Sequence, residues 1–208
     1  MFFKCSMNEG RVWALGALMK AFAVEARIRS PGGMLQPFRG EVGAVIRRSD
    51  GQFQCDFASS AMAGGGMLHA PYPDWVYSQS VAYIRHDLAY RQLALVDGQG
   101  QELPFIPPLA DESGSSLFPA ASYAGWISHA DGGREPFKAH VGSPVPGGIG
   151  FECPVSCSRY PKLSPSRSDW PEQAYELAFM LLRQLLLADG ATLSDEGGRP
   201  LDLIAPVG

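Results

Sequence analysis

Long apolar runs, cysteines and positive charges are all scarce in this chain. No stretch reaches the roughly 20 apolar residues that a membrane-spanning helix needs. The longest apolar run lies inside residues 177–188 and is broken by Arg183 and Gln184. The first residues lead into no apolar segment of the kind that a secretory signal contains. We therefore expect a cytoplasmic protein without a membrane partner.

Only four cysteines and four histidines occur among the 208 residues. The cysteines are Cys5, Cys55, Cys153 and Cys157. Without an export signal, we expect them to be reduced thiols rather than a disulfide framework. A metal site could be built from His129, His140, Cys153 and Cys157, but the Cys-x3-Cys spacing is not that of a zinc knuckle. We expect separate thiols, surface histidines and no cofactor.

The net charge is -4, from 17 Lys and Arg against 21 Asp and Glu, which argues against non-specific binding to a nucleic-acid duplex. The charge is unevenly distributed. Residues 1–60 carry eight basic and five acidic side chains, a balance of +3, and the remainder carries nine and sixteen, a balance of -7. Any contact with nucleic acid is therefore expected within the first 60 residues.

Hydrophobic residues make up 46% of the chain, and 24 Gly and 17 Pro predict frequent turns and modest helix content. The clearest element is a helix over 170–188, with Asp169 and Glu172 in the spacing of a capping box and Gly190 after its end. It is apolar nearly all round, so we expect it to be buried in a core or an interface. A second helix is expected over 8–26.

The rest of the chain is expected to be mainly strands and loops. A hairpin is predicted over 35–57 because apolar and polar residues alternate on both sides of a Ser-Asp-Gly turn. Further strands are expected at 75–84, 90–96, 102–106, 123–128, 136–141, 148–153 and 201–204, with loops at 63–66 and 110–122 and a linker at 158–168. No internal repeat is evident.

These elements predict an α+β fold of mainly antiparallel β structure, as an OB-like barrel or a ferredoxin-like sheet. An N-terminal helix and one long buried C-terminal helix complete it. We expect residues 1–106 to form a helix plus an OB-like β module. Residues 107–208 would form the remaining β segments and the C-terminal helix, packed as one unit with the first part.

The predicted hairpin carries the candidate binding residues. Phe53, Cys55 and Phe57 alternate with polar residues and are expected in the core. The candidate nucleic-acid-binding residues on the hairpin are Arg39, Arg47, Arg48, Gln52 and Gln54. Single-strand-binding proteins combine such a basic groove with aromatic rings that stack on bases. Trp75 is the main candidate for stacking, with Tyr72 and Tyr77 beside it in the sequence.

Three segments of the front part resemble a known family. They are Val12-Trp13-x-Leu15-Gly16-Ala17-Leu18-x-x-Ala21, Arg39-Gly40-Glu41-Val42 and Ser49-Asp50-Gly51-x-Phe53-x-x-x-Phe57. Together they resemble the N-terminal OB-fold domain of the exodeoxyribonuclease VII large subunit, a module that binds single-stranded DNA. The resemblance covers about residues 12–57, departs from the family at Gln52, where the family has His, and does not extend to the nuclease core.

A glycine-rich turn, Gly147-Gly148-Ile149-Gly150, gives a looser resemblance to the RNA-binding ferredoxin-like subunits of CRISPR-type ribonucleoproteins. No helix start follows it, so a phosphate-binding loop is not supported. Tyr83, His86 and Asp87 could suggest acid–base chemistry, but neither a nucleophile in a sharp turn nor a carboxylate pair accompanies them.

The sequence thus predicts a non-catalytic subunit of a larger assembly that binds single-stranded DNA or RNA. The first alternative is a protein–protein adaptor or inhibitor, with the acidic C-terminal two thirds as its contact surface and the 170–188 helix as its docking element. An RNA-binding subunit of a CRISPR-type complex is a further alternative. An enzyme with an unrecognised site comes last.

Overall fold

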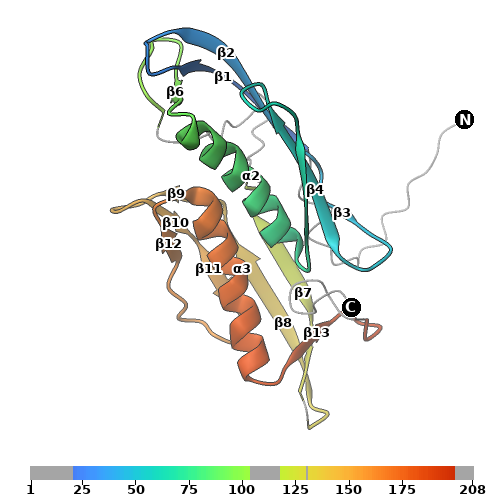
Figure 1. The fold of residues 1–208 in the computed structure, drawn as a ribbon. Coiled ribbons are helices and arrows are strands. Elements are labelled where there is room, and N and C mark those ends of the chain that lie inside the picture. The colour runs from blue at the N-terminus through green and yellow to red at the C-terminus, as the bar shows by residue number, and fades with distance from the viewer. Residues whose placement is uncertain (1–20, 104–117, 130, 200–208) are drawn as a thin grey trace, which may run out of the picture.

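The computed structural model describes residues 21–103, 118–129 and 131–199 (Figure 1). Its elements are antiparallel strands and two helices, which confirms the α+β class and the mainly antiparallel pairing. The first half contains β1 (Phe22–Arg29), β2 (Leu35–Val42), β3 (Ile46–Arg47), β4 (Phe53–Ser59), β5 (Gly66–Ala70), α2 (Pro73–Tyr90) and β6 (Ala94–Val96). The second half contains β7 (Ala121–Ser128), β8 (Arg134–Val141), β9 (Val145–Pro146), β10 (Phe151–Cys153), β11 (Val155–Cys157), β12 (Ser166–Ser168), α3 (Pro171–Ala188) and β13 (Thr192–Ser194).

The two halves are copies of one fold, so the expectation of no internal repeat was wrong. Each half runs through a long hairpin, a two-residue strand, further strands, an 18-residue helix and a closing strand. The two repeats also share individual hydrogen bonds. The thiols of Cys55 and Cys153 donate to the carbonyl oxygens of Gly43 and Gly142, at 3.4 and 3.1 Å.

The main hairpins of the two repeats also share their turn and their exit. Gly33 and Gly132 both have a positive φ, 81° and 86°, which favours glycine in the turn. After the hairpin, the Ser60 hydroxyl accepts from the Arg39 amide, and the Ser158 hydroxyl accepts from the Lys138 amide. These shared contacts fix the same backbone path in sequences that differ at most other positions.

The sheets are open, and among the described strands no closed barrel forms. The first sheet has the order β3-β4-β2-β1-β6, with β5 also on β4. In the second repeat the strand equivalent to β4 is divided into β10 and β11 at Pro154. Proline has no N–H for a ladder hydrogen bond, so the second repeat forms two smaller sheets, β11-β8-β7-β13 and β12-β10-β9.

Each helix packs on the strands of its own repeat, and the two helices pack against each other. Helix α2 lies on β2, β4 and β5, and α3 lies on β8, β10 and β12. Figure 1 shows the helices side by side, with strands of both repeats behind them. One connected hydrophobic core joins the repeats and includes Tyr77, Phe118 and Tyr175. Neither described helix is long and apolar enough to cross a membrane.

The strand predicted at 75–84 is wrong, because these residues lie within α2. Pro73 stands in the first turn, where its fixed φ suits a helix. Val76, Tyr77, Val81, Ile84 and Leu88 are buried at helical spacing. Apolar and small polar residues are mixed in this segment, so part of it alternates as a strand would. Only the spacing of apolar residues over the whole segment distinguishes the helical pattern from the strand pattern.

Several other boundaries also differ from expectation. Residues 22–26, predicted as the end of a helix, begin β1, and residues 8–20 lie outside the described part. The predicted linker 158–168 ends in β12, and the predicted loop 110–122 overlaps the start of β7. The predicted strand at 201–204 lies outside the described residues. The hairpin, the strands at 123–128 and 136–141 and the helix over 170–188 are confirmed.

Two ion pairs, one buried and one partly buried, join the helices in a reciprocal way. Nη1 and Nη2 of Arg183 donate to both carboxylate oxygens of Asp74, at 2.6 and 2.7 Å. At the equivalent position Nε of Arg85 donates to Oε1 of Glu172 at 2.6 Å. Each acid lies in the first turn of one helix and each arginine lies late in the other, so the helices run antiparallel.

Each of these guanidinium groups also stacks on the aromatic residue that precedes its partner helix. The Cζ of Arg183 lies 4.0 Å from the centre of the Tyr72 ring, and that of Arg85 lies 4.0 Å from the centre of the Trp170 ring. Cation–π contact of this kind stabilises a desolvated cation. The expected capping box is not formed. Glu172 forms an ion pair with Arg85, and the N-cap residue of α3 is Trp170 instead of Asp169.

Arg183→Met should lower the free energy of unfolding by about 3–5 kcal/mol, because it leaves the Asp74 carboxylate buried without a partner. The matched control is Arg167→Met, which removes an exposed pair with Glu152 and should cost no more than about 1 kcal/mol. Urea denaturation followed by circular dichroism measures both. Equal losses in the two variants would contradict the role given to the buried pair.

Candidate functional surfaces

The arginines predicted to bind nucleic acid lie on or beside the β2–β4 hairpin, and Arg39 is already paired. Its Nε donates to Glu41 at 2.6 Å and its Nη1 donates to Glu25 at 2.7 Å. The hydrogen bond to Glu41 contributes most to raising the pKa of Arg39. Glu25 lies directly opposite Arg39 across the β1–β2 ladder. Two carboxylates therefore neutralise this cation on the outer face of the first sheet.

Arg48 lies at the end of the same hairpin in a polar cluster. Its Nε donates to the Asp50 carboxylate at 3.1 Å, and its Nη1 lies 3.5 Å from Oε1 of Gln54. Gln54 also donates to Asp56 at 3.2 Å, and the backbone amide of Gln52 donates to Asp50. The structure thus brings Arg48, Gln52 and Gln54 together around Asp50.

Arg47 lies with its guanidinium carbon 5.9 Å from the centre of the Phe53 ring. The expected core positions are confirmed, because Phe53, Cys55 and Phe57 are all buried. The outer face of this sheet therefore presents arginines and carboxylates in comparable number and no aromatic side chain from β4.

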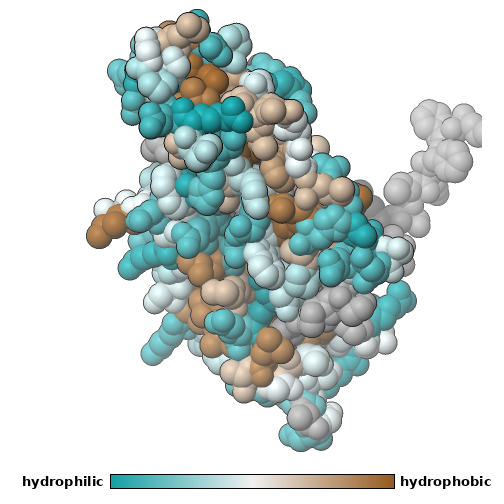
Figure 2. Space-filling view, viewed as in Figure 1, coloured by the Kyte–Doolittle hydropathy of each residue, from teal (hydrophilic) through white to brown (hydrophobic). Residues whose placement is uncertain are grey.

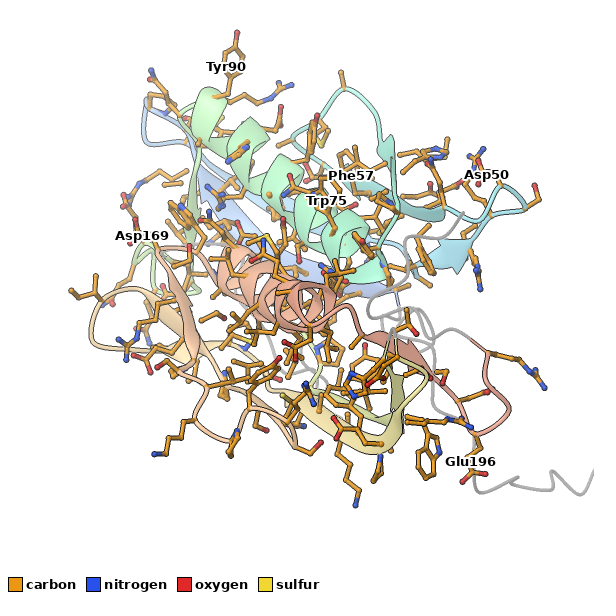
Figure 3. All side chains as sticks on the ribbon, turned by 90° about the horizontal axis from the view of Figure 1, so that it is seen from below. Asp50, Phe57, Trp75, Tyr90, Asp169 and Glu196 are labelled. Carbon is orange, nitrogen blue, oxygen red and sulfur yellow. The ribbon has the colours of Figure 1, made fainter. Side chains whose placement is uncertain are left out.

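The predicted stacking residues do not join the hairpin arginines. Trp75 lies on α2 rather than on a strand and is 41% exposed. Tyr72 lies under the Arg183 guanidinium, and Tyr77 is fully buried. Figure 3 shows Trp75 on α2, away from Asp50 at the hairpin turn. The aromatic and basic candidates thus belong to two different surfaces.

The two helices form a further surface, for which the sequence indicated only the apolar character of the C-terminal helix. We call it the helical face and define it by the exposed side chains of Trp75, Tyr83 and Tyr90 on α2 and of Met180 and Leu187 on α3. On α2 these residues recur at about two helical turns, so they lie on one side of the helix. The view of Figure 2 shows brown, apolar atoms where α3 lies in Figure 1.

Helix α3 differs from α2 most clearly on this face. Met180 and Leu187 are exposed, and α2 has Ala82 and Ala89 at the equivalent positions. Gln173 and Gln184 are the exposed polar residues of this helix, and Glu176 is a half-buried acidic residue on it. Burial is the main cause that raises the pKa of Glu176, whose carboxylate accepts from Gln79 of α2 at 2.9 Å. The face over α3 is thus nearly free of exposed charge.

The outer face of the second sheet also differs from its counterpart. The outward residues of β7 are Ser122, Ala124, Trp126 and Ser128, and those of β8 are Arg134, Pro136, Lys138 and His140. None of these is acidic. Lys138 stands where the first repeat has Arg39, and Ala124 stands where it has Glu25, so the partner carboxylate is missing.

Two contacts order this face. The Arg134 guanidinium carbon lies 5.0 Å from the centre of the Trp126 ring, and its Nη2 donates to the carbonyl oxygen of Asp195 at 2.8 Å. The Ser122 hydroxyl lies 3.0 Å from Nδ1 of His140. Lys138 lies between these two contacts on β8.

The cysteines and histidines considered as metal ligands do not converge. His140 faces outward from β8, and the Cys153 thiol is buried and donates to Gly142. Cys153 and Cys157 are free thiols. His129 lies 3.5 Å from the Glu135 carboxylate. Within the described residues, no group of three or more His, Cys, Asp or Glu side chains could hold a metal ion.

Comparisons with protein-family models, curated proteins and solved structures gave no match. The resemblance to the OB-fold domain therefore stays a prediction.

The free energy of unfolding should fall between about pH 9 and pH 11. Burial raises the pKa of Cys55 to about 11 and that of Cys153 to about 12, and it also raises the pKa of Tyr77 and Tyr175. Unfolded thiols lose their proton near pH 8.5. Stability that these groups contribute is therefore complete below that pH and is lost as pH rises through the folded values.

Urea midpoints at pH 8.0 and pH 10.5 measure this loss. The double variant Cys55→Ala/Cys153→Ala should show a smaller drop between the two pH values than the parent protein, whatever its stability at pH 8.0. In the native protein at pH 7.5, neither thiol should react with iodoacetamide, and both should react in urea. Rapid labelling of either thiol in the native protein would contradict the burial of Cys55 and Cys153 and the raised pKa that follows from it.

Proposed function

We propose that this protein is a protein-binding module of a larger assembly, with the helical face as its docking surface. The observation that carries the proposal is the exposure of Met180 and Leu187, 37% and 56%, on a helix face nearly without charge. Exposed apolar side chains that gather on one face are typical of protein–protein interfaces. Aromatic residues and methionine are enriched in such interfaces, and the helical face also includes Trp75, Tyr83 and Tyr90.

The architecture supports this use of the helices. Each helix is anchored on one side by its sheet and on a second side by the reciprocal ion pairs, which hold the backbone of the face rigid. A rigid surface loses little conformational entropy on binding. A partner helix or sheet could therefore contact α2 and α3 together without rearrangement of the module.

The double variant Met180→Asp/Leu187→Asp should abolish the complex and leave the fold intact, because both side chains are exposed and new charge on an apolar interface costs desolvation energy. The control Ile46→Asp/Met67→Asp places the same charges on residues of similar exposure, 52% and 54%, in the first sheet. Gel filtration of the tagged protein from its native cells measures complex formation, and circular dichroism checks the fold.

A photo-crosslinking residue identifies the face directly. Benzoylphenylalanine at position 187 should link the protein to its partner, and the same residue at position 67 should not. A complex that survives the α3 double variant, or crosslinks that form only from position 67, would contradict the proposal. Crosslinks from position 187 to a second copy of the chain alone would also contradict it and identify a dimer face.

Single-stranded nucleic-acid binding is the second candidate function. The observation that favours it is the outer face of the second sheet, where Lys138, His140 and Arg134 lie beside Trp126 without an outward-facing carboxylate on β7 or β8. A basic surface with aromatic side chains is what single strands require. On the predicted hairpin, Arg39 would first have to leave Glu25 and Glu41.

Fluorescence anisotropy with a labelled 20-nucleotide strand, in a series of salt concentrations, tests this candidate. We expect an affinity that falls steeply as salt rises and that decreases at least tenfold in Lys138→Glu/His140→Glu. A similar loss in Arg39→Ala/Arg47→Ala/Arg48→Ala instead would place the contact on the hairpin, as the sequence predicts. Absent or salt-independent binding would exclude both surfaces.

A further inference from the structure

The side chains that meet between α2 and α3 carry one more negative charge than positive charge. Each arginine of the reciprocal pairs holds one carboxylate of the other helix, that of Asp74 or that of Glu172. Glu176 adds a third carboxylate beside them. Both guanidinium groups are already engaged, so one of the three acids lacks a cationic partner among the described residues.

Glu176 is the acid without a cation. Its carboxylate accepts a hydrogen bond from the neutral amide of Gln79, at 2.9 Å, and it forms no ion pair within the described part of the chain. Burial is the main cause that raises the pKa of Glu176, and the carboxylates of Asp74 and Glu172 raise it further. Arg183 acts in the opposite direction. The negative charge of Glu176 is therefore only partly compensated.

A carboxylate oxygen of Glu172 also lacks a hydrogen-bond donor. The side chain of Glu172 is only 3% exposed, and its Oε1 accepts from Arg85, but its Oε2 has no partner among the described residues. A buried polar atom without a hydrogen bond is costly. Glu172 and Glu176 are four residues apart on α3, so they lie one turn apart on the same side of the helix. Two neighbouring carboxylates are thus short of donors.

The fold does not require a carboxylate at position 176. The equivalent residue of α2 is Ser78, which is neutral and buried. The equivalent of Gln79 on α3 is Leu177, so the contact between Gln79 and Glu176 has no counterpart in the other half of the helix pair. Unlike the reciprocal arginine pairs, Glu176 is a feature of α3 alone, as the exposed Met180 is.

Glu176 lies on the same side of α3 as the exposed apolar residues. Met180 follows it by four residues and Leu187 by eleven, which places all three in one stripe along the helix. Glu176 is half-buried, so a side chain from outside the molecule can reach its carboxylate. A partner that covers Met180 and Leu187 would also remove this charge from water. That removal is costly unless the partner brings a cation.

We propose that the partner docks on the helical face with a lysine or arginine side chain, which donates to the Glu176 carboxylate next to apolar side chains that cover Met180 and Leu187. This inference rests on the proposed docking function and adds the chemistry of the partner. Hydrogen bonds between charged groups are stronger than those between neutral groups. The apolar contact supplies buried area, and the ion pair selects a basic segment over a neutral or acidic one.

Selection of phage-displayed random peptides on the immobilised full-length protein tests the proposal. Binders that fail to bind the variant Met180→Asp/Leu187→Asp are retained, since they use the helical face. Most of the retained peptides should carry a lysine or arginine beside apolar residues. Circular dichroism checks that each protein variant is folded.

The retained peptides then allow a double-mutant cycle, measured by fluorescence anisotropy. Glu176→Gln should weaken binding about tenfold, and norleucine in place of the basic residue of the peptide should do the same. Both changes together should weaken binding hardly more than either alone, because they remove one interaction. The control Asp56→Asn also removes a carboxylate that accepts from a glutamine amide, and it should leave binding unchanged.

Different results would overturn the inference and the docking surface. The inference alone is overturned if peptides that need Met180 and Leu187 lack a basic residue, or if they bind Glu176→Gln as tightly as the parent protein. Additive losses in the double-mutant cycle would overturn it as well. If no binder is obtained, or if none is sensitive to the α3 double variant, the docking surface is wrong and the inference falls with it.

Discussion

The two reciprocal arginine–carboxylate pairs between α2 and α3 are the constraint on which the rest of the structure depends. Removing an arginine or a carboxylate from water is costly, and that cost is recovered only when geometry and hydrogen bonding are good. Here the Arg183–Asp74 pair is bidentate and both side chains are almost fully buried. The pairs fix the antiparallel register of the helices, since any slip along the axis would leave buried charges unmatched.

That register decides which surfaces reach solvent. Each helix has one side on its own sheet and one side on the other helix, so a third side of both helices remains open on the same face of the molecule (Figure 1). The residues that bind the repeats together are thus buried next to the residues that we propose to bind a partner. Duplication of one unit has produced a rigid two-helix surface that a single repeat could not offer.

The repeats have kept their interiors and changed their surfaces. Inward positions such as Phe38 and Phe137, or Cys55 and Cys153, are retained. Outward positions differ in kind, with a charge-balanced face on the first sheet and a carboxylate-free outward face on β7 and β8. A fold can carry different chemistry on different surfaces, and the two repeats of this chain differ in this way on their outward faces.

The sequence predicted those elements whose signals are local. The helix over 170–188 was predicted because its end signals and periodicity occupy one segment, and the first hairpin was predicted because its alternation is regular. The repeat was missed because the surfaces diverged, so the shared residues are few and widely spaced. The neutralisation of Arg39 by Glu25 was missed as well, because strand pairing brings together residues that are distant in sequence.

The helical face could be predicted only in part. The nearly all-round apolar character of the helix over 170–188 indicates either a core or an interface, and the structure shows a core side with Phe179 and Leu182 and an open side with Met180 and Leu187.

We infer that the helix pair makes the two repeats one cooperative unit. Native-state hydrogen exchange measured residue by residue tests it most directly, since it reports the opening free energy of each segment. If the repeats unfold together, the slowest amides of β2 and of β8 exchange with the same free energy, through unfolding of the whole molecule. Clearly different values, with one repeat opening while the other stays folded, would contradict it.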